Sequence, residues 1–391
     1  MNVFALVVIL LILAAFAVDK YVHKQFEKRQ LRRCSLVYIL ASYAVYLALM
    51  LAVVYTQMRA DISQVVLGWG FAVALAVLLS KFAYGIALVL SLVPKIWRGA
   101  SWGFVRRAGA VIGFAVLGYF VYSAVVTTRR VEVVDVEFVS ERIPAKFDGY
   151  RIVQFSDMHA GMFARSGGFV DRLVDSINAQ HPDLIAFTGD IVNLRTAELY
   201  PFLKKLRRLH ARDGVVAVTG NHDYGDYARW KTEQERVQSF DELMTLMTDS
   251  LGWQVLNNRS IALRRQNDSI DIVGVENWGE PPFKQYGDLD AALANVCDTT
   301  YTILLSHNPR HWDCEVAGKT NVDLTLSGHT HAMQTRFGNF SPSAWRYEHW
   351  AGATSIGNQW LYVNIGCGEV GIPVRFGATP EITLITLKSK Q

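Results

Sequence analysis

The sequence predicts an α/β domain preceded by an N-terminal bundle of about four transmembrane helices. Of the 391 residues, 51% are hydrophobic and only 19% are charged, and the apolar excess lies at the front of the chain. In the C-terminal half, five short β-branched or apolar runs each end in small or polar residues, as buried strands do where they enter loops. We therefore divide the chain into a membrane region (1–126), a connecting segment (127–149) and an α/β domain (150–391).

Four apolar stretches support the membrane region. A membrane-spanning helix needs about 20 apolar residues. Buried helices of a soluble fold are the alternative, but four such stretches within 126 residues leave little polar surface for one. A signal peptide is a second reading of the first stretch, yet no basic residue precedes its apolar core, which favours a retained anchor. The stretches are Val3–Val18, Leu36–Tyr55, roughly Val65–Val93 and Ala108–Val126.

The basic residues between these stretches predict the orientation. They fill the first and third loops, whereas the second has only Arg59, balanced by Asp61. By the positive-inside rule the two basic loops are cytoplasmic, so the domain after Val126 lies outside the cytoplasm of an inner or plasma membrane. Arg129 and Arg130 are a small contrary signal. The basic residues are Lys20, Lys24, Lys28, Arg29, Arg32 and Arg33 in the first loop, and Lys95, Arg98, Arg106 and Arg107 in the third.

Three further features bear on the surroundings of the domain. Lys81 interrupts the third stretch; it is a functional candidate, although snorkelling or facing a neighbouring helix is the favoured reading. The connecting segment alternates apolar and polar residues in VEVVDVEFV, which predicts an edge strand and places the domain's site close to the bilayer. The segment Ala228–Asp249 reads as a mainly polar helix that could shape a substrate pocket or meet lipid headgroups.

Five polar clusters follow the five strand-like runs. Carboxylate, imidazole and amide groups suit hard-to-borderline divalent metals. Side chains two residues apart in an extended segment point the same way and can hold one ion. Each cluster alone is an ordinary turn, but five in order predict a metal site. They are Asp157-Met158-His159, Gly189-Asp190, Gly220-Asn221-His222-Asp223, Ser306-His307-Asn308 and Gly328-His329-Thr330-His331.

These clusters carry a resemblance. From about Tyr150 to its end, the chain resembles the calcineurin-like metallophosphoesterase superfamily, whose pattern D-x-H, G-D, G-N-H-D/E, H and G-H-x-H is complete here. The flanking sequences, such as VVAVTGNHDY and DLTLSGHTHAMQ, are most similar to those of the membrane-anchored branch. Asp223 stands where many members have Glu, and Ala332 where many soluble members have Gly. The resemblance implies a four-layer β-sandwich flanked by helices.

The resemblance also implies two adjacent divalent metals, for which Mn, Fe, Zn and Ni all suit the ligands. Two such ions clamp a phosphoryl group and lower the pKa of a bridging water, so that hydroxide attacks phosphorus. The implied ligands are Asp157, His159, Asp190 and His331 for the first metal, and Asp190, Asn221, His307 and His329 for the second, with Asp190 bridging.

His222 is the expected general acid, or a donor to a phosphate oxygen. The ordinary pKa of histidine, about 6.5, suits proton transfer near neutral pH. A structural turn residue is the alternative. Asp223 is expected to orient that imidazole or raise its pKa. Arg165, Arg195 and Tyr224 lie near motif loops and could touch substrate.

The expected function is a membrane-anchored, dinuclear phosphoesterase. Its substrate is a phosphodiester, pyrophosphate or phosphomonoester, and a lipid-linked one is the natural expectation because the anchor keeps the site beside membrane lipids. The alternatives are a cytoplasm-facing pyrophosphatase of a UDP-linked lipid, a non-catalytic receptor or scaffold, and a transporter. All seven ligands are retained, which disfavours a scaffold. The net charge of +4 gives no support for nucleic-acid binding.

Cysteine usage leaves the compartment open. Cys297, Cys314 and Cys367 form no CxxC pair. One disulfide between Cys297 and Cys314, or unpaired buried thiols, are equally consistent with this number.

Overall fold

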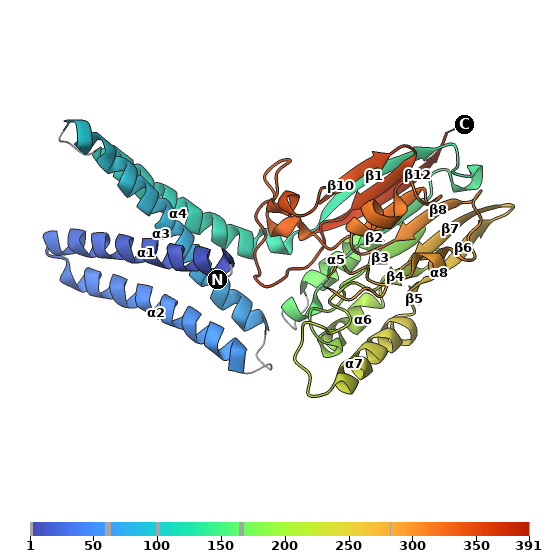
Figure 1. Ribbon diagram of the computed structural model, residues 1–391, viewed down its shortest axis with the longest axis horizontal. Coiled ribbons are helices and arrows are strands. Elements are labelled where there is room, and N and C mark those ends of the chain that lie inside the picture. The colour runs from blue at the N-terminus through green and yellow to red at the C-terminus, as the bar shows by residue number, and fades with distance from the viewer. Residues whose placement is uncertain (1–2, 59–63, 99–101, 164–167, 282, 391) are drawn as a thin grey trace. The chain divides into compact units, whose positions relative to one another are not determined.

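The computed structural model describes residues 3–58, 64–98, 102–163, 168–281 and 283–390. The main division of the chain falls between Val125 and Val126, where a helical unit gives way to an α/β unit (Figure 1).

The helical unit contains four long helices in its described residues: α1 (Val3–Lys28), α2 (Arg32–Met58), α3 (Gln64–Arg98) and α4 (Gly103–Val125). Helix α3 packs along α4, and α1 packs against both α2 and α3. Glycines allow α3 and α4 to approach closely, because a Cβ at Gly109 would overlap Ala87, and the Ser80 hydroxyl donates to the Gly113 carbonyl at 2.7 Å.

Two segments of this unit are long and apolar enough to cross a membrane, judged on length and composition within the described residues. They are Val65–Val93 and Gly103–Arg129. The other two predicted stretches lie within α1 and α2.

The α/β unit is built on two mixed sheets, each six-stranded within the described residues, so the predicted α/β class of the domain is confirmed. In the first sheet, β12 runs parallel to β1 and antiparallel to β2, and β2 to β5 are parallel. Its order is β1 (Glu132–Ser140), β12 (Glu381–Ser389), β2 (Arg151–Phe155), β3 (Leu184–Thr188), β4 (Val215–Val218) and β5 (Gln254–Val255).

The second sheet has a parallel centre and an antiparallel strand at each edge. Strands β11, β9, β8 and β7 are parallel, while β10 and β6 pair antiparallel with their neighbours. Its order is β10 (Gly352–Ile356), β11 (Gln359–Val363), β9 (Leu324–Ser327), β8 (Tyr301–Leu305), β7 (Asp268–Gly274) and β6 (Arg259–Arg265).

Alternating side chains of the strands build separate cores. In β3, Ile185 and Phe187 join one cluster, whereas Leu184 and Ala186 join the cluster between the two sheets. Helices cover the outer faces: α5 (Gly168–Asn178), α6 (Leu203–Leu206) and α7 (Glu233–Thr245) pack on the first sheet, and α8 (Leu289–Leu293) packs on the second. Buried on both faces, the parallel strands are near-continuous apolar runs, as the sequence shows.

The five predicted strand runs form β2, β3, β4, β8 and β9, and every polar cluster begins one or two residues after the last residue of its strand. Because these strands are parallel within each sheet, their loops leave at one edge. Hydrogen bonds join the loops: the Asp157 N–H donates to Gly189 O, and the Gly328 N–H donates to His307 O, each at 2.9 Å.

The structure also describes the predicted edge strand, the predicted polar helix and the two cysteines of the possible disulfide. Strand β1 lies at the edge of the first sheet. Helix α7 occupies part of the predicted 228–249 segment and begins after Thr232, whose hydroxyl accepts from the Glu235 N–H at 3.2 Å. Cys297 and Cys314 are free thiols in the structure, so the disulfide reading is not supported.

Candidate metal centre

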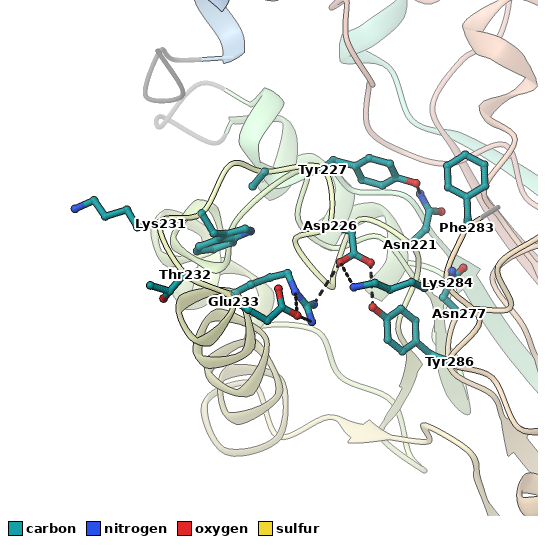
Figure 2. A pocket seen from close by; sticks show the side chains of 13 residues that line it. Asn221, Asp226, Tyr227, Lys231, Thr232, Glu233, Asn277, Phe283, Lys284 and Tyr286 are labelled. Atoms are coloured by element: carbon teal, nitrogen blue, oxygen red, sulfur yellow. Dashed lines mark hydrogen bonds and ion pairs between the residues drawn. The ribbon is translucent and has the colours of Figure 1, made fainter. Parts of the chain in front are cut away.

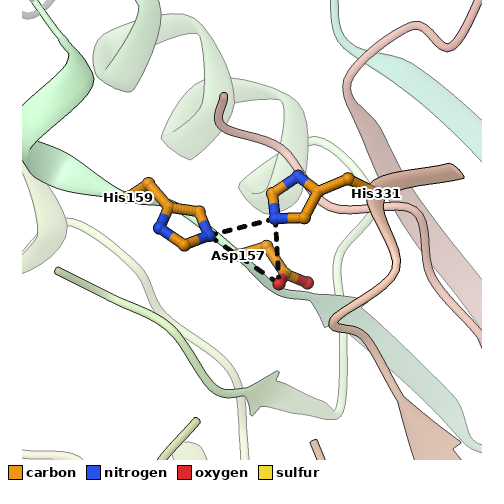
Figure 3. A group of neighbouring side chains, drawn as sticks. All are labelled: Asp157, His159 and His331. Atoms are coloured by element: carbon orange, nitrogen blue, oxygen red, sulfur yellow. Dashed lines mark hydrogen bonds and ion pairs between the residues drawn. The ribbon is translucent and has the colours of Figure 1, made fainter. Parts of the chain in front are cut away.

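The first group of predicted ligands meets at a buried carboxylate (Figure 3). The Nε2 atom of His331 lies 3.2 Å from Asp157 Oδ1 and 3.0 Å from the Nε2 atom of His159. Two imidazole nitrogens and a carboxylate oxygen therefore face one point from loops after β2 and β9. This is a donor set for a divalent transition metal.

The second group lies beside the first and shares Asp190 with it. Asp190 Oδ2 is 3.1 Å from His307 Nε2 and 3.6 Å from His159 Nε2. His307 Nε2 is also 3.2 Å from His329 Nδ1 and 3.1 Å from Asn221 Oδ1. The structure thus brings all seven predicted ligands together, with Asp190 between the two groups.

Contacts behind the imidazoles fix their orientation. His307 Nδ1 donates to the Thr188 carbonyl at 2.7 Å, which leaves Nε2 facing the centre. His329 Nε2 lies 2.9 Å from the Tyr347 hydroxyl, which leaves Nδ1 facing it. Such outer partners set the tautomer and direction of a metal-binding histidine.

Sequence reasoning missed two such partners, Tyr347 and Arg375. Arg375 is fully buried, and its guanidinium lies 3.2 Å from His331 Nδ1 while donating to the carbonyls of Ile365 and Ala378. A lone arginine in the apolar closing segment PVRFGATPE was a usable signal. The sequence offers no such signal for Tyr347, because this residue lies in a loop far from any motif.

The ligand backbone is strained. Five of the seven ligands have positive φ: Asp157 (53°), His159 (46°), Asp190 (62°), His329 (74°) and His331 (49°). This region is sparsely populated by residues with a Cβ, and each instance costs about 1–3 kcal/mol. Strain concentrated in this way marks a functional site, since the surrounding structure must hold it.

Gly189 shows why the loops need glycine. Its φ is 99°, and a Cβ there would lie 2.7 Å from both the Gly220 nitrogen and His307 Nδ1. A side chain at this position would push the second and third loops apart, so the spacing of the ligands depends on its absence.

In the absence of a metal, electrostatics favour the metal-binding forms of His159 and Asp190 but not that of His307. Burial lowers the pKa of His159, and the neighbouring His222 lowers it further, so the imidazole is neutral. Burial opposes ionisation of Asp190, but His307 and His222 outweigh it and hold the pKa of that carboxyl well below its usual range. For His307, burial acts to lower the pKa, yet Asp190 and Asp157 raise it to about 10. A metal would displace that proton.

His222 lies at the edge of the centre and is half-buried. Its backbone N–H donates to Asp190 Oδ1 at 2.8 Å, and Nδ1 donates to the Asn193 carbonyl at 2.7 Å. Its ring stands edge-on to His159 at 4.7 Å between centroids. A ring nitrogen of His222 lies close enough to His159 and Asp190 for the three residues to hold one ion, so geometry permits a ligand role as well as the predicted acid role.

Asp223 does not take its predicted place beside His222. Its Oδ1 accepts from the N–H groups of Ile191 (2.9 Å) and Val192 (3.2 Å). Its Oδ2 accepts from Asp190 N–H (2.9 Å) and Gly220 N–H (2.8 Å). The described hydrogen bonds of the Asp223 carboxylate are thus all with backbone N–H groups, and none of them reaches the His222 ring that Asp223 was expected to orient. Asp223 is a positioning residue that holds the loop carrying Asp190.

Residues 150–333 match the family described as calcineurin-like phosphoesterase. The metallophosphoesterase YkuE of Bacillus subtilis is 32% identical over 283 residues, which is 70% of this chain and 91% of that protein. This chain belongs to the calcineurin-like metallophosphoesterase family.

Two more relatives belong to the same group. A Danio rerio protein called transmembrane protein with metallophosphoesterase domain is 30% identical over 297 residues, covering 74% of this chain and 64% of that protein. A metallophosphoesterase of Helicobacter pylori (strain ATCC 700392 / 26695) is 29% identical over 283 residues, covering 71% of this chain and 70% of its own length. As a calcineurin-like metallophosphoesterase, the chain is a hydrolase of phosphate esters.

The family implies divalent metal ions, and the residues fit them. Two buried imidazole nitrogens 3.0 Å apart beside ionised carboxylates are more readily explained by a shared cation than by hydrogen bonds among themselves. His159 Nδ1 is buried and lacks a hydrogen-bond partner within the described protein, and its ring packs against the rings of His222 and His331.

Three more residues, Arg165, Arg195 and Tyr224, were predicted to lie where they could touch substrate. Arg195 packs on the Trp230 ring at 4.2 Å and donates to the Arg229 carbonyl. The Tyr224 hydroxyl is 2.7 Å from the Thr219 hydroxyl. Neither side chain contacts the ligands in the described contacts, and Arg165 lies outside the described residues.

Proposed function

We propose that this metallophosphoesterase is a membrane-anchored, dinuclear enzyme that hydrolyses phosphate esters outside the cytoplasm. The observation that carries the dinuclear centre is the position of Asp190, whose Oδ2 faces His159 on one side and His307 on the other. One carboxylate oxygen between two sets of imidazole nitrogens is suited to bridge two ions.

Seven residues would hold the two ions: Asp157, His159, Asp190 and His331 the first, and Asp190, Asn221, His307 and His329 the second. When bound, such a pair of ions would act as a Lewis acid on the phosphoryl group and would lower the pKa of a bound water. Mn, Fe, Zn and Ni all suit these ligands.

His222 would complete the reaction as the general acid. The attacking water would first lose one proton to solvent. A bond would then form from its oxygen to phosphorus as the bond from phosphorus to the leaving oxygen breaks, and that leaving oxygen would take the Nε2 proton of the His222 imidazolium, which becomes neutral. The Asn193 carbonyl holds Nδ1–H, so Nε2 is the nitrogen free for this transfer. Because its backbone N–H is bonded to Asp190, His222 stays in register with the bridging carboxylate.

Membrane anchoring rests on three observations. Two segments are long and apolar enough to span a bilayer, the Danio rerio relative is named a transmembrane protein, and the basic residues gather in the first and third loops. We propose four spans in residues 1–126, with the α/β domain extracytoplasmic. A site held beside lipid suits a lipid-linked phosphate ester.

Turnover with metal analysis tests the enzyme. Full-length protein in detergent, loaded with Mn²⁺, should hydrolyse bis(4-nitrophenyl) phosphate or a lipid phosphate from a panel of diesters, pyrophosphates and monoesters, and elemental analysis should find about two ions per chain. One ion per chain with full turnover would contradict the dinuclear centre. Metal-free protein without turnover on any substrate would leave a receptor or scaffold as the better account.

Topology is tested separately. Alkaline phosphatase fused to the C-terminal end should be active, and a fluorescent protein that matures only in the cytoplasm should stay dark at the same position. The reverse result would favour the cytoplasm-facing pyrophosphatase of a UDP-linked lipid.

A further inference from the structure

A group of large apolar side chains is exposed in the segment that follows the fifth motif. They belong to residues 332–347, which we call the aromatic loop. Trp345 is 82% exposed, the highest value among the large hydrophobic side chains of the described residues, and Met333, Phe337 and Phe340 are 56%, 56% and 49% exposed. Single exposed apolar residues are common, but several in one segment mark a surface that another molecule covers.

Three of these rings form one patch. Backbone hydrogen bonds join Phe337 and Phe340 in both directions, at 2.9 and 3.1 Å, across a tight turn at Gly338. Residues paired in this way direct their side chains to the same face. The Phe340 ring stands edge-on to Trp345, with 6.3 Å between ring centroids. A cation lies beside the turn, because the Arg336 guanidinium donates to the Gly338 carbonyl at 3.2 Å.

Hydrogen bonds at the base of the aromatic loop hold its backbone in place. The buried Ser341 hydroxyl donates to the Ala332 carbonyl at 2.6 Å and accepts from the Ser343 N–H at 3.1 Å. The Arg336 N–H donates to the Phe376 carbonyl at 2.7 Å. The backbone is thus fixed on both sides of the turn, and the fold itself presents the rings to the outside.

The charged groups on and around the aromatic loop are mainly positive. The loop contains two arginines, Arg336 and Arg346, and no Asp or Glu. Arg346 pairs with Glu280, which also lies 3.5 Å from Arg310. Even when Glu348, the exposed carboxylate that follows the loop, is included, three arginines face two carboxylates at this surface.

The aromatic loop adjoins the metal centre. It begins directly after the ligand His331, and the hydroxyl of its last residue, Tyr347, lies 2.9 Å from the Nε2 atom of the ligand His329. A molecule that covers the loop therefore lies beside the ligands.

A phospholipid surface suits this combination of groups. Trp is enriched in the interfacial region of bilayers, where its ring meets acyl carbons, and basic side chains next to such rings meet the phosphates of anionic lipids. Two segments of the chain are long and apolar enough to cross a membrane, and the anchoring proposed above would keep a bilayer within reach of the loop.

We propose that the aromatic loop docks the α/β domain on the bilayer surface, with Phe337, Phe340 and Trp345 among the upper acyl carbons and Arg336 at the lipid phosphates. This inference rests on the membrane anchoring in the proposed function and not on the hydrolysis. Docking at this surface brings the phosphate groups of membrane lipids next to the metal centre.

Photocrosslinking tests the docking. Full-length protein in nanodiscs of phosphatidylcholine and phosphatidylglycerol carries p-benzoylphenylalanine in place of Trp345 or Phe340, and mass spectrometry identifies what each probe captures on irradiation. Both probes should yield lipid adducts. A probe at Ile356 is the control and should yield about tenfold less, because Ile356 is 54% exposed but lies at the end of β10 remote from the motif loops.

The role of the arginine is tested by lipid charge. The adduct at position 345 should be more abundant in discs with phosphatidylglycerol than in discs of phosphatidylcholine alone. Arg336→Gln should lower the yield in the anionic discs by up to about fivefold, the factor that one basic side chain contributes at an anionic surface. Arg264→Gln, an exposed position at the end of β6 remote from the motif loops, should leave the yield unchanged.

The outcomes separate docking from the other claims. Lipid adducts at position 356 as abundant as those at 340 and 345 would show that the aromatic loop has no preferred contact with the bilayer, and this inference would be wrong. Crosslinked dimers in place of lipid adducts would also overturn it, because a second copy of the chain would then cover the loop. If the protein does not enter nanodiscs, the proposed anchoring fails, and this inference with it. The measurement needs no turnover, so it stands apart from the test of hydrolysis.

Discussion

Asp190 and Asp223 show how one residue type takes two roles in one site. Asp223 accepts four backbone N–H bonds, three of them from Asp190, Ile191 and Val192. Because these bonds hold the backbone at Asp190, its side chain is free to face the histidines. The charge of Asp223 thus serves geometry, whereas the charge of Asp190 serves the ions.

His222→Ala tests the proposed general acid. We expect both ions to stay bound, and kcat for an alkyl phosphate ester to fall about 10²–10⁴-fold, the usual contribution of a general acid. Esters of 4-nitrophenol should suffer much less, because that leaving group needs no proton. Equal losses on both ester types, or loss of an ion on elemental analysis, would show His222 acting as a ligand instead.

Asp223→Asn provides the contrasting case. The amide cannot accept at both positions, so about two backbone N–H groups lose their acceptor, at about 1–3 kcal/mol each. We expect a lower melting temperature and weaker metal retention on dialysis, with losses of similar size for good and poor leaving groups. A variant with wild-type melting and metal content that is slow only on poor leaving groups would restore Asp223 as a partner of His222.

At this scale the sequence predicted which side chains meet but not how each is oriented. The resemblance implied seven ligands, and the structure brings those seven side chains close together. Adjacency in Gly220–Asp223 suggested that Asp223 supports His222, whereas the turn sends Asp223 toward the Asp190 loop and His222 toward Asn193. The contact of Arg375 was not predicted for a different reason: Arg375 reaches His331 only because β12 returns to the first sheet beside β2.

At the scale of elements, the first three helices are joined by a buried polar cluster. The Lys81 ammonium of α3 lies 2.6 Å from Asp19 Oδ1 of α1, 2.7 Å from the Ser42 hydroxyl and 2.9 Å from the Tyr46 hydroxyl of α2. The Tyr38 hydroxyl also donates to Asp19, at 2.6 Å. Lys81 thus faces neighbouring helices, the reading favoured from sequence. Its partner was not foreseen, because Asp19 borders the first apolar stretch and reads as part of the loop.

A double-mutant cycle on this pair tests whether it is structural. Lys81→Met alone leaves the Asp19 carboxylate buried without its cation, and Asp19→Asn alone leaves the Lys81 ammonium buried without its anion. Each single change should lower the free energy of unfolding by about 3–5 kcal/mol. The double variant should recover most of that loss in denaturant unfolding of detergent-solubilised protein, and should keep phosphoesterase activity. Restored stability with abolished activity would instead mean that Lys81 has a functional role.

The sheets were easier to predict than the parts around them. Runs such as RIVQF and YTILL are mostly apolar because both faces of β2 and β8 are largely buried, and that pattern can be recognised in the sequence alone. The segment Ala228–Asp249 was expected to shape a pocket, and Lys231 and Glu233 from it line a cavity beside Asn221 (Figure 2). The opposing wall near Phe283 could not be predicted, because it meets this segment only when the loop after β7 folds beside it.

At the scale of the whole molecule, a buried carboxyl predicts how stability depends on pH. Glu381, at the start of β12, accepts from the hydroxyls of Tyr362 and Thr383, each at 3.0 Å, and lies 3.3 Å from the Asn364 amide. Asn364 also accepts from Ser156, the residue before the ligand Asp157, at 3.3 Å. The carboxyl therefore belongs to a polar network that ties the first sheet to the metal loops.

Burial raises the pKa of Glu381 from 4.5 to about 7. A group with a raised folded pKa contributes stability that is fully present below its unfolded pKa and is lost as pH rises through the folded one, here between about pH 4.5 and pH 7. Glu381→Gln, which keeps the shape without the charge, should therefore melt close to wild type at pH 5 and above it at pH 8. The gain should be on the order of 2–3 kcal/mol in unfolding free energy. Glu137→Gln, at an exposed position of β1, is the matched control and should melt like wild type at both pH values. A Glu381→Gln variant that is less stable than wild type at pH 8 would mean that the ionised carboxylate is the form the network requires, and that the hydrogen bonds from Tyr362, Thr383 and Asn364 outweigh the cost of burying its charge.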